Sequence, residues 1–269
     1  MRLQGDLSWA VELAEEAGTL IACARDNGFE QSLKDDNSIV TSADLASDEI
    51  LRTGIQRHAP NDALLTEEAG WFPGTSGNRT WVVDPLDGTR AFTMGQEGVS
   101  VLLGLIEGGS PVLGIAHFPF EKTTYWAVKG EGAFKKNLST GRVEPLPAPR
   151  RMNPALMALS PSTPPEKRKA LLAKTGLQLG PLLHGAGAKF MCVADGRASA
   201  YFSGHGLSLW DTAGPGVILK ELGCRVTSDR GHDLIYNVKG TDWTHNGGIV
   251  VTAELEHQQV IRHIQEVES

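Results

Sequence analysis

The stretch Trp81-Val82-Val83-Asp84-Pro85-Leu86-Asp87-Gly88-Thr89-Arg90 decides how the rest of the chain is interpreted. Residues 81–83 are apolar, which predicts a buried strand. We expect this strand to end at Asp84-Pro85, because proline has no N–H to donate to a neighbouring strand. Gly88 permits close approach of the backbone, and Thr89 is expected to cap a following helix. Two carboxylates beside a helix N-terminus predict a site that binds a cation and a phosphate together.

The composition narrows the function classes. The chain has 269 residues, 41% of them hydrophobic, with a formal net charge of −7. This length suits one large domain or two closely packed halves. The negative charge argues against a partner that is a nucleic acid polymer, and no apolar stretch approaches the length needed for membrane insertion. The negative charge does not exclude a phosphorylated small molecule as partner, because a bound cation can invert the local field. Whether the chain is a monomer or a homodimer is left open.

The termini and cysteines bear on the compartment. Residues 1–6 are polar and lack the apolar core of a signal peptide. Cys23, Cys192 and Cys224 are odd in number and widely spaced, without a CxxC pair. We therefore expect a cytoplasmic protein with buried free thiols.

Apolar periodicity and turn residues predict the order of elements. A cluster of prolines over residues 145–154 marks a boundary near residue 150. Residues 1–150 are expected to form an α+β half and residues 151–269 an α/β half, together one compact unit. Before the boundary we expect helices at 7–23 and 42–58, a polar loop at 34–41, strands at 63–66, 99–106, 112–118 and 123–128, and a surface loop or mobile lid at 71–78. After it we expect strands at 156–159, 198–202, 225–227 and 248–252, and helices at 165–174, 188–194, 210–222 and 254–264.

Acidic residues recur at strand ends and helix starts, where a scaffold can direct them to one point. Hard oxygen ligands without Cys or His favour Mg²⁺ or Mn²⁺ over zinc. Clustered carboxylates repel one another unless cations lie between them, so we expect two or three ions. Taken alone, each acid has a simpler interpretation: compensation of a helix dipole for Asp44, and solvent exposure for Glu67 and Glu68. The candidate acids are Asp44, Glu67, Asp84, Asp87 and Asp211.

This pattern predicts hydrolysis of a phosphate ester by activated water. Thr89 with Asp44 could orient the water or accept its proton. N–H groups near Gly88 and Thr89 could hold phosphate oxygens, and the Leu86 carbonyl could be a metal ligand. Two alternatives stay open: a covalent phosphoaspartate at Asp84, although the motifs typical of such enzymes are missing, and a non-enzymatic cation-binding module.

Two motifs and their spacing resemble the lithium-sensitive, magnesium-dependent phosphatases of the inositol monophosphatase superfamily. The stretch at 81–89 matches the first motif, and Leu209-Trp210-Asp211-Thr212-Ala213-Gly214 matches the second. The resemblance implies a five-layer αβαβα sandwich of the inositol monophosphatase and fructose-1,6-bisphosphatase type. It also implies that Asp44 and Thr89 activate the water, and it implies a set of metal ligands: Glu67, Asp84, the Leu86 carbonyl, Asp87 and Asp211.

Within the superfamily the chain looks most like 3'(2'),5'-bisphosphate nucleotidases, which convert 3'-phosphoadenosine 5'-phosphate (PAP) to AMP. The segment Lys34-x-Asp36-Asn37-Ser38-x-Val40-Thr41-x-Ala43-Asp44 and the segment 188–196 resemble that subgroup. Residues 201–210 contain no acid, whereas inositol phosphatases place a Glu just before the Trp-Asp pair. Two departures weaken the resemblance: Ala186 stands where a hydroxyl residue is usual, and Arg90-Ala91 replaces Lys-Glu. Inositol 1-phosphate or a related sugar phosphate is the alternative substrate.

The substrate-binding residues are the least constrained part of the prediction. Lys189 lies in an otherwise apolar helix, where a lysine either extends to solvent or binds a substrate phosphate. His205 lies on a glycine-rich loop and either stacks on a base or has no special role. The resemblance and the loop position together give a candidate substrate-binding set: Gly88, Thr89, Lys189, His205 and Asp211.

Overall fold

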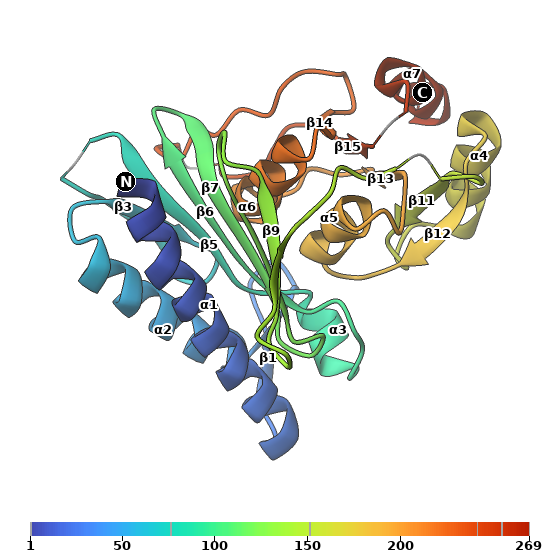
Figure 1. The fold of residues 1–269 in the computed structure, drawn as a ribbon. Coiled ribbons are helices and arrows are strands. Elements are labelled where there is room, and N and C mark those ends of the chain that lie inside the picture. Colours follow the sequence, from blue (N-terminus) through green and yellow to red (C-terminus); the bar gives the residue numbers. More distant parts are fainter. Residues whose placement is uncertain (1, 76, 151, 241, 254, 269) are drawn as a thin grey trace.

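The computed structural model describes residues 2–75, 77–150, 152–240, 242–253 and 255–268. Within these ranges, helices and sheets alternate in five layers (Figure 1). Helices α1 (Arg2–Asn27) and α2 (Ser42–His58) cover one face of a large sheet, and α5 (Ala186–Ala194) and α6 (Leu209–Glu221) cover the other. A smaller sheet follows, with α4 (Pro165–Thr175) and α7 (His257–Glu268) on its far side. The predicted αβαβα sandwich is confirmed.

The two sheets differ in strand direction. In the large sheet, of order β10-β9-β8-β7-β6-β5-β3-β4, all neighbours are antiparallel except β3 and β5. The small sheet, of order β12-β11-β13-β15-β14, is mixed. The large sheet comprises β3 (Ala63–Thr66), β4 (Gly70–Phe72), β5 (Arg79–Asp87), β6 (Ser100–Glu107), β7 (Ser110–Phe118), β8 (Thr123–Val128), β9 (Ala133–Asn137) and β10 (Val143–Pro145). The small sheet comprises β11 (Leu156–Leu159), β12 (Gln178–Leu182), β13 (Ala200–Ser203), β14 (Arg225–Ser228) and β15 (Ile249–Thr252).

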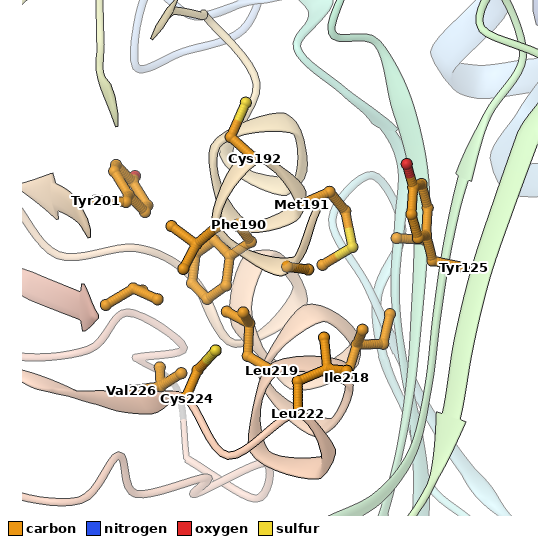
Figure 2. Close-up of a cluster of buried hydrophobic side chains, with 14 of the residues drawn as sticks. Tyr125, Phe190, Met191, Cys192, Tyr201, Ile218, Leu219, Leu222, Cys224 and Val226 are labelled. Atoms are coloured by element: carbon orange, nitrogen blue, oxygen red, sulfur yellow. The ribbon is translucent and has the colours of Figure 1, made fainter. Parts of the chain in front are cut away.

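Central strands are apolar on both faces because both faces are covered by helices. In β13, Ala200 and Phe202 pack with Ile261 of α7, whereas Tyr201 packs with Phe190 of α5 on the opposite face. The alternation follows from the period of two in a strand. Figure 2 shows the middle layer, in which side chains of α5 and α6 fill the space between the two sheets.

Helix α6 packs against the large sheet at unusually short range. A Cβ on Gly104 would lie 2.6 Å from the Ala213 Cβ, and one on Gly114 would overlap the Gly214 carbonyl. Glycines on β6, β7 and α6 therefore let the helix backbone lie directly on the strands. This close contact fixes the height of the α6 N-terminus above the end of β5, where the candidate site lies.

Most predicted elements are present, with four corrections. Strand β5 continues through Pro85 to Asp87, because pairing with β6 is irregular between Asp84 and Asp87 and proline's missing N–H costs nothing there. Gly88, in a left-handed conformation, is the N-cap of α3 (Thr89–Thr93), so Thr89 is the first helical residue and not the cap. The polar segment 34–41 is part of a hairpin between β1 (Gln31–Leu33) and β2 (Ile39–Thr41).

The fourth correction concerns the predicted lid. Trp71 and Phe72 lie in β4, which pairs with β3 and packs against neighbouring apolar clusters, so they are anchored in the sheet.

Cys192 and Cys224 are buried as expected, but Cys23 is exposed because it lies off the packed face of α1. Ser76 of the predicted loop, Arg151 at the predicted boundary and Glu254 at the predicted start of the last helix lie outside the described residues. The division into halves stays a prediction. None of the helices in the described ranges combines the length and hydropathy needed to span a bilayer.

Candidate active site

Three carboxylates meet where β5 ends below the first turn of α6. Among the described residues, Asp84, Asp87 and Asp211 each offer an oxygen within 4.8 Å of the others. Asp84 pairs with Leu102 and Asp87 with Ser100, so one residue of β6 faces two of β5 between them. Such a bulge redirects side chains at a strand end. Two acids three positions apart on a strand, which would otherwise face opposite ways, are thereby brought to one point.

Asp87 is held by the N-terminus of α5. Its Oδ1 accepts from the Ala186 N–H at 2.8 Å, and its Oδ2 accepts from the Gly187 N–H and the Ser100 hydroxyl, each at 2.8 Å. A Cβ on Gly187 would lie 2.7 Å from Ser100 Oγ and 3.0 Å from Asp87 Oδ2, so any larger residue would crowd the carboxylate and its hydroxyl donor. Asp87 therefore links the end of the large sheet to the middle helical layer.

Asp44 and Asp211 are positioned by the same local device. Each is the third residue of a helix and closes a capping box, with Thr41 in α2 and with Ser208 in α6. One oxygen of Asp44 accepts from the Thr41 N–H at 2.8 Å, and one of Asp211 accepts from the Ser208 N–H at 2.7 Å. The other oxygen of each is left for the site. The simple interpretation of Asp44 as an N-terminal charge is thus correct but incomplete.

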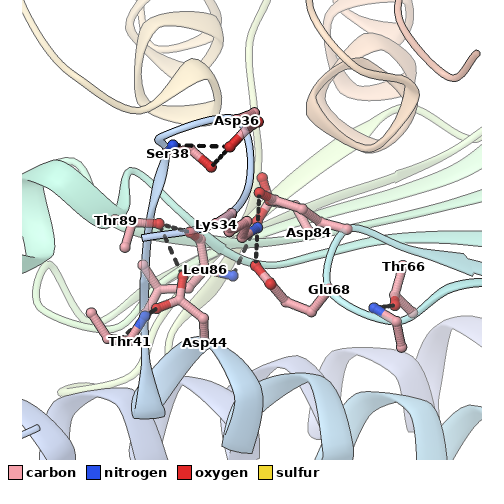
Figure 3. Close-up of polar contacts among 12 residues, drawn as sticks. Lys34, Asp36, Ser38, Thr41, Asp44, Thr66, Glu68, Asp84, Leu86 and Thr89 are labelled. Atoms are coloured by element: carbon pink, nitrogen blue, oxygen red, sulfur yellow. Dashed lines mark hydrogen bonds and ion pairs between the residues drawn. The ribbon is translucent and has the colours of Figure 1, made fainter. Parts of the chain in front are cut away.

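Thr89 connects Asp44 to the β5 turn (Figure 3). Its hydroxyl lies 2.9 Å from Asp44 Oδ1, to which it donates, and 3.3 Å from the Leu86 carbonyl oxygen. The Leu86 N–H donates to Asp84 Oδ1 at 3.0 Å. A hydroxyl that donates to a carboxylate keeps its lone pairs for a water molecule.

Glu67 and Glu68 do not point into solvent as the simple interpretation predicted. The Lys34 ammonium, on the turn of the β1–β2 hairpin, lies 2.9 Å from Glu67 and 2.7 Å from Glu68 (Figure 3). The Glu68 side chain is only 6% exposed. No sequence pattern predicted this contact, although Lys34 opens the segment that resembles the nucleotidase subgroup. Glu67 is outside the three-carboxylate group but adjoins it, since Glu67 and Asp87 repel one another electrostatically.

The charges of the site explain why it requires a cation. Burial and repulsion from Glu67 and Asp87 hold the pKa of Asp84 well above its usual range. Burial and the neighbouring Asp87 and Glu67 raise the pKa of Asp211 to about 8. Burial also raises the pKa of Glu68 to about 7, although Lys34 opposes that shift. Buried carboxylates with hard oxygen donors and raised pKa values fit a divalent cation of the magnesium type.

A cavity of about 580 Å³ opens beside the acids and is lined by Asp87, Gly88 and Asp211 on one side. His205 lines it and is exposed. Lys189 lines it too, but its side chain does not extend to solvent: its ammonium donates to the carbonyls of Leu183, His184 and Gly185 at 3.0, 2.8 and 2.6 Å. Side chains on this wall that the sequence did not single out are Lys167, His184, Ser160, Ser162 and Thr163. No motif marks them, because they come from loops and a helix end of the second sheet.

Comparisons with known proteins agree with this geometry. The family model described as "Inositol monophosphatase family" matches residues 3–269. The chain belongs to the inositol monophosphatase family. It is 32% identical over 234 residues to the 3'(2'),5'-bisphosphate nucleotidase CysQ of Salmonella typhimurium, covering 86% of this chain and 93% of that protein. It is 30% identical over 270 residues to the Nus factor SuhB of Pasteurella multocida, covering 96% and 95%.

Solved structures of the family share the fold. An IMPase from Thermotoga maritima superposes with a TM-score of 0.83 at 22% identity, covering 98% of both chains. SaIMPase-II with bound 2'AMP superposes with a TM-score of 0.77 at 25% identity, covering 100% of this chain and 98% of that one. As a member of the inositol monophosphatase family, the chain is a phosphoric monoester hydrolase of a magnesium-dependent kind, and its acidic cluster has the donor chemistry to hold the metal.

Proposed function

We propose that this phosphatase hydrolyses 3'(2'),5'-bisphosphate nucleotides, converting PAP to AMP and phosphate. The observation that carries the choice is the character of the cavity lining. It contains the cationic side chains of Arg90, next to Thr89, and of Lys167, several hydroxyl groups, and no acid between residues 201 and 210. Such a lining favours a substrate with a second anionic group over a neutral polyol such as the inositol ring.

The proposed metal ligands are the acids gathered at the end of β5. Asp84, Asp87 and Asp211 would hold one ion between them. Glu67 and the Leu86 carbonyl would bind a second ion. A third ion could bind only if the Lys34 ammonium, which lies between Glu67 and Glu68, moved away from them. Mg²⁺ is the proposed ion, with Mn²⁺ as a substitute. Bound there, divalent ions lower the pKa of a water molecule and neutralise phosphate oxygens.

Thr89 and Asp44 are the proposed proton-handling pair. The Thr89 hydroxyl donates to Asp44 at 2.9 Å, so its lone pairs can accept from the attacking water and orient it. Asp44 is buried and its pKa is raised by burial, although Thr41 and Thr89 oppose that shift by hydrogen bonding. A buried carboxylate held in this way is a suitable final acceptor for a proton passed through the hydroxyl.

The remaining substrate contacts are proposed from position. The N–H groups of Gly88 and Thr89 begin α3 at the edge of the cavity and are placed to donate to oxygens of the reacting phosphate. Lys189 would act through the 183–185 loop that it holds, and its positive charge lies close enough to Asp87 and Asp211 to stabilise both. His205 would contact the base from the exposed rim. We place the activity in the cytoplasm, since the three cysteines are free.

A comparison of catalytic efficiencies tests the proposal. Purified protein with Mg²⁺ is assayed for phosphate release from PAP, 3'-AMP and inositol 1-phosphate. We expect kcat/KM for PAP to exceed that for inositol 1-phosphate by about 100-fold or more, the size expected for charge-assisted hydrogen bonds to a second phosphate. A preference for inositol 1-phosphate would overturn the choice of substrate and leave the phosphatase assignment intact.

A further inference from the structure

Lys167 lines the same cavity as Asp87 and Asp211 but comes from a different part of the fold, helix α4. It is in the first turn of α4, and its ammonium lies beside the backbone of Gly204, where a Cβ would approach to 2.8 Å. It also lies 5.9 Å from the centre of the Phe202 ring. Lys167 of α4, Phe202 of β13 and Gly204 just after β13 thus lie close together at the cavity. Helix α4 itself covers the face of the small sheet that is turned away from α5 (Figure 1).

Among the described residues, one carboxylate binds this lysine. The Lys167 ammonium lies 2.7 Å from Glu268 Oε1 and 2.8 Å from Glu268 Oε2, in the last turn of α7. Both side chains are about one-third exposed, at 31% and 29%. A carboxylate that binds an ammonium with both oxygens occupies the place that two oxygens of a phosphate would take.

The other two cationic side chains that line the cavity, Lys189 and Arg90, are less suited to bind a second phosphate. All three N–H donors of Lys189 are directed at backbone carbonyls. Arg90 adjoins Thr89 at the acidic side, beside the reacting phosphate in the proposed function. Lys167 is thus the cation of this wall that is positioned to bind a group far from the acids, and Ser160, Ser162 and Thr163 line the cavity beside it.

We propose that Lys167 determines specificity by binding the second, non-reacting phosphate of the substrate, and that Glu268 holds Lys167 when this phosphate is absent. The inference rests on the proposed function, because it needs a substrate with two phosphates. On binding, the phosphate replaces Glu268 as the partner of the ammonium, and no covalent bond is made or broken. Glu268 therefore opposes binding of bisphosphates, while having no direct contact with the reacting phosphate.

The experiment compares PAP with 3'-AMP, which lacks the second phosphate. In Lys167→Met we expect the ratio of kcat/KM for PAP to kcat/KM for 3'-AMP to fall by about tenfold, carried by a higher KM for PAP, since one charge-assisted contact is lost. Lys167→Arg should keep most of the ratio. In Glu268→Gln we expect the ratio to rise by about two- to fivefold, because the lysine is released from its partner.

The chain offers a matched control between the same two helices. Lys174 of α4 and Glu266 of α7 form an ion pair at 2.9 Å, and neither lines the cavity. Lys174→Met and Glu266→Gln make the same changes of charge and should leave the ratio within twofold of wild type. Thermal melting of each variant checks that it is folded.

The outcomes separate the two proposals. If wild type prefers PAP but Lys167→Met leaves the ratio as it is, or if Glu266→Gln raises the ratio as much as Glu268→Gln does, the role of Lys167 and Glu268 is wrong and the nucleotidase proposal stands. If wild type shows no preference for PAP over 3'-AMP, no second phosphate is recognised and this inference fails, whatever the variants do. If it also prefers inositol 1-phosphate, the proposed function fails with it.

Discussion

The acidic side and the cationic side of the cavity are built in different ways. On the acidic side, Asp87 and Asp211 are fixed by backbone N–H donors of two helix N-termini, at 2.7 to 2.8 Å. On the cationic side, Lys167 is held by the side-chain carboxylate of Glu268 and is about one-third exposed. Backbone donors cannot move without unfolding a helix end, whereas a side-chain ion pair in contact with water exchanges partners at little cost.

The difference teaches which part of the molecule carries the chemistry and which part is free to vary. Fixed acids suit a reaction whose geometry is the same for every phosphate ester, because catalysis depends on preorganised charges. A wall of exchangeable side chains suits the choice among substrates.

Asp84→Asn should have the largest effect. The substitution removes a carboxylate from the centre of the proposed metal site, so we expect kcat to fall by a factor on the order of 10³ or more. The metal-free variant should melt at the same or a higher temperature than wild type, because repulsion with Glu67 and Asp87 is relieved. Phosphate release and thermal melting in EDTA measure the two effects, and Asp26→Asn, at an exposed position near the end of α1, is the control. Near wild-type turnover would contradict the metal assignment.

Thr89→Ala should follow in size. Loss of the hydroxyl removes the link between Asp44 and the attacking water, and we expect kcat to fall by about 10²- to 10⁴-fold with little change in KM. Thr89→Ser keeps the hydroxyl and should retain most of the activity. The kinetic comparison decides the matter: equal losses in both variants would show that the methyl group, not the hydroxyl, is what the site needs.

Removal of metal should make stability depend on pH in a definite direction. Burial and neighbouring acids raise the pKa of Asp211 from 3.8 to about 8 and that of Glu68 from 4.5 to about 7. The folded protein then binds more protons than the unfolded chain, so stability falls as pH rises toward 8. We expect the melting temperature in EDTA to fall between pH 6.5 and 8, and excess Mg²⁺ to flatten the slope.

Buried histidines oppose this slope at the lower end of the window. Burial lowers the pKa of His117, His245 and His257 to about 4, so their opposing effect is present below their ordinary pKa of 6.5 and fades above it, and the fall in melting temperature should be clearest between pH 7 and 8. Burial lowers the pKa of Lys189 to about 8, which acts in the opposite direction above that pH. A melting temperature in EDTA that rises with pH inside the window would show that the acids are not coupled as the structure places them.

Ala186→Ser should have the smallest effect. Ala186 lines the cavity at the start of α5, where family members usually carry a hydroxyl, and its N–H already binds Asp87. A new hydroxyl could donate to a substrate phosphate, and we expect KM for PAP to fall by about two- to fivefold with kcat little changed. A lower kcat instead would indicate that the added hydroxyl disturbs Asp87. The cavity lining at residue 186 would then tolerate substitution less well than the contrast between the fixed acids and the exchangeable wall predicts.

Much of the fold follows from local patterns in the sequence. Strands such as 123–128 and 156–159 are found at their predicted bounds, because apolar runs between turn residues are a local signal. The predictions that were wrong concern segments whose structure depends on the strand that lies beside them. Trp71 and Phe72 form a strand only because β3 is available beside them, and β5 passes through Pro85 only because β6 leaves that residue unpaired.

The candidate site likewise contains residues that the sequence predicted and contacts that it did not. Five acids were singled out, four of them because they stand at a strand end or a helix start, and the structure brings Asp84, Asp87 and Asp211 together with Asp44 and Glu67 beside them. The contact of Lys34 with Glu67 and Glu68, the three carbonyls around Lys189, and the pairing of Lys167 with Glu268 were not foreseen. The Lys34 and Lys167 contacts join residues of different elements, so no local pattern encodes them. The carbonyls around Lys189 are only four to six residues upstream, but a side chain directed at the start of its own helix has no sequence signature.

By itself the sequence determined the order of elements, the two acid-bearing motifs and the capping boxes, because these depend on residues within a few positions of one another. Only the tertiary structure decided how the stretch from Trp81 to Arg90 is used. The bulge after Asp84 turns two acids to one side, α5 supplies the donors for Asp87, and glycines let α6 approach closely enough to add Asp211. The physical reason is that a shared site needs distances between distant segments, and those distances are fixed by packing.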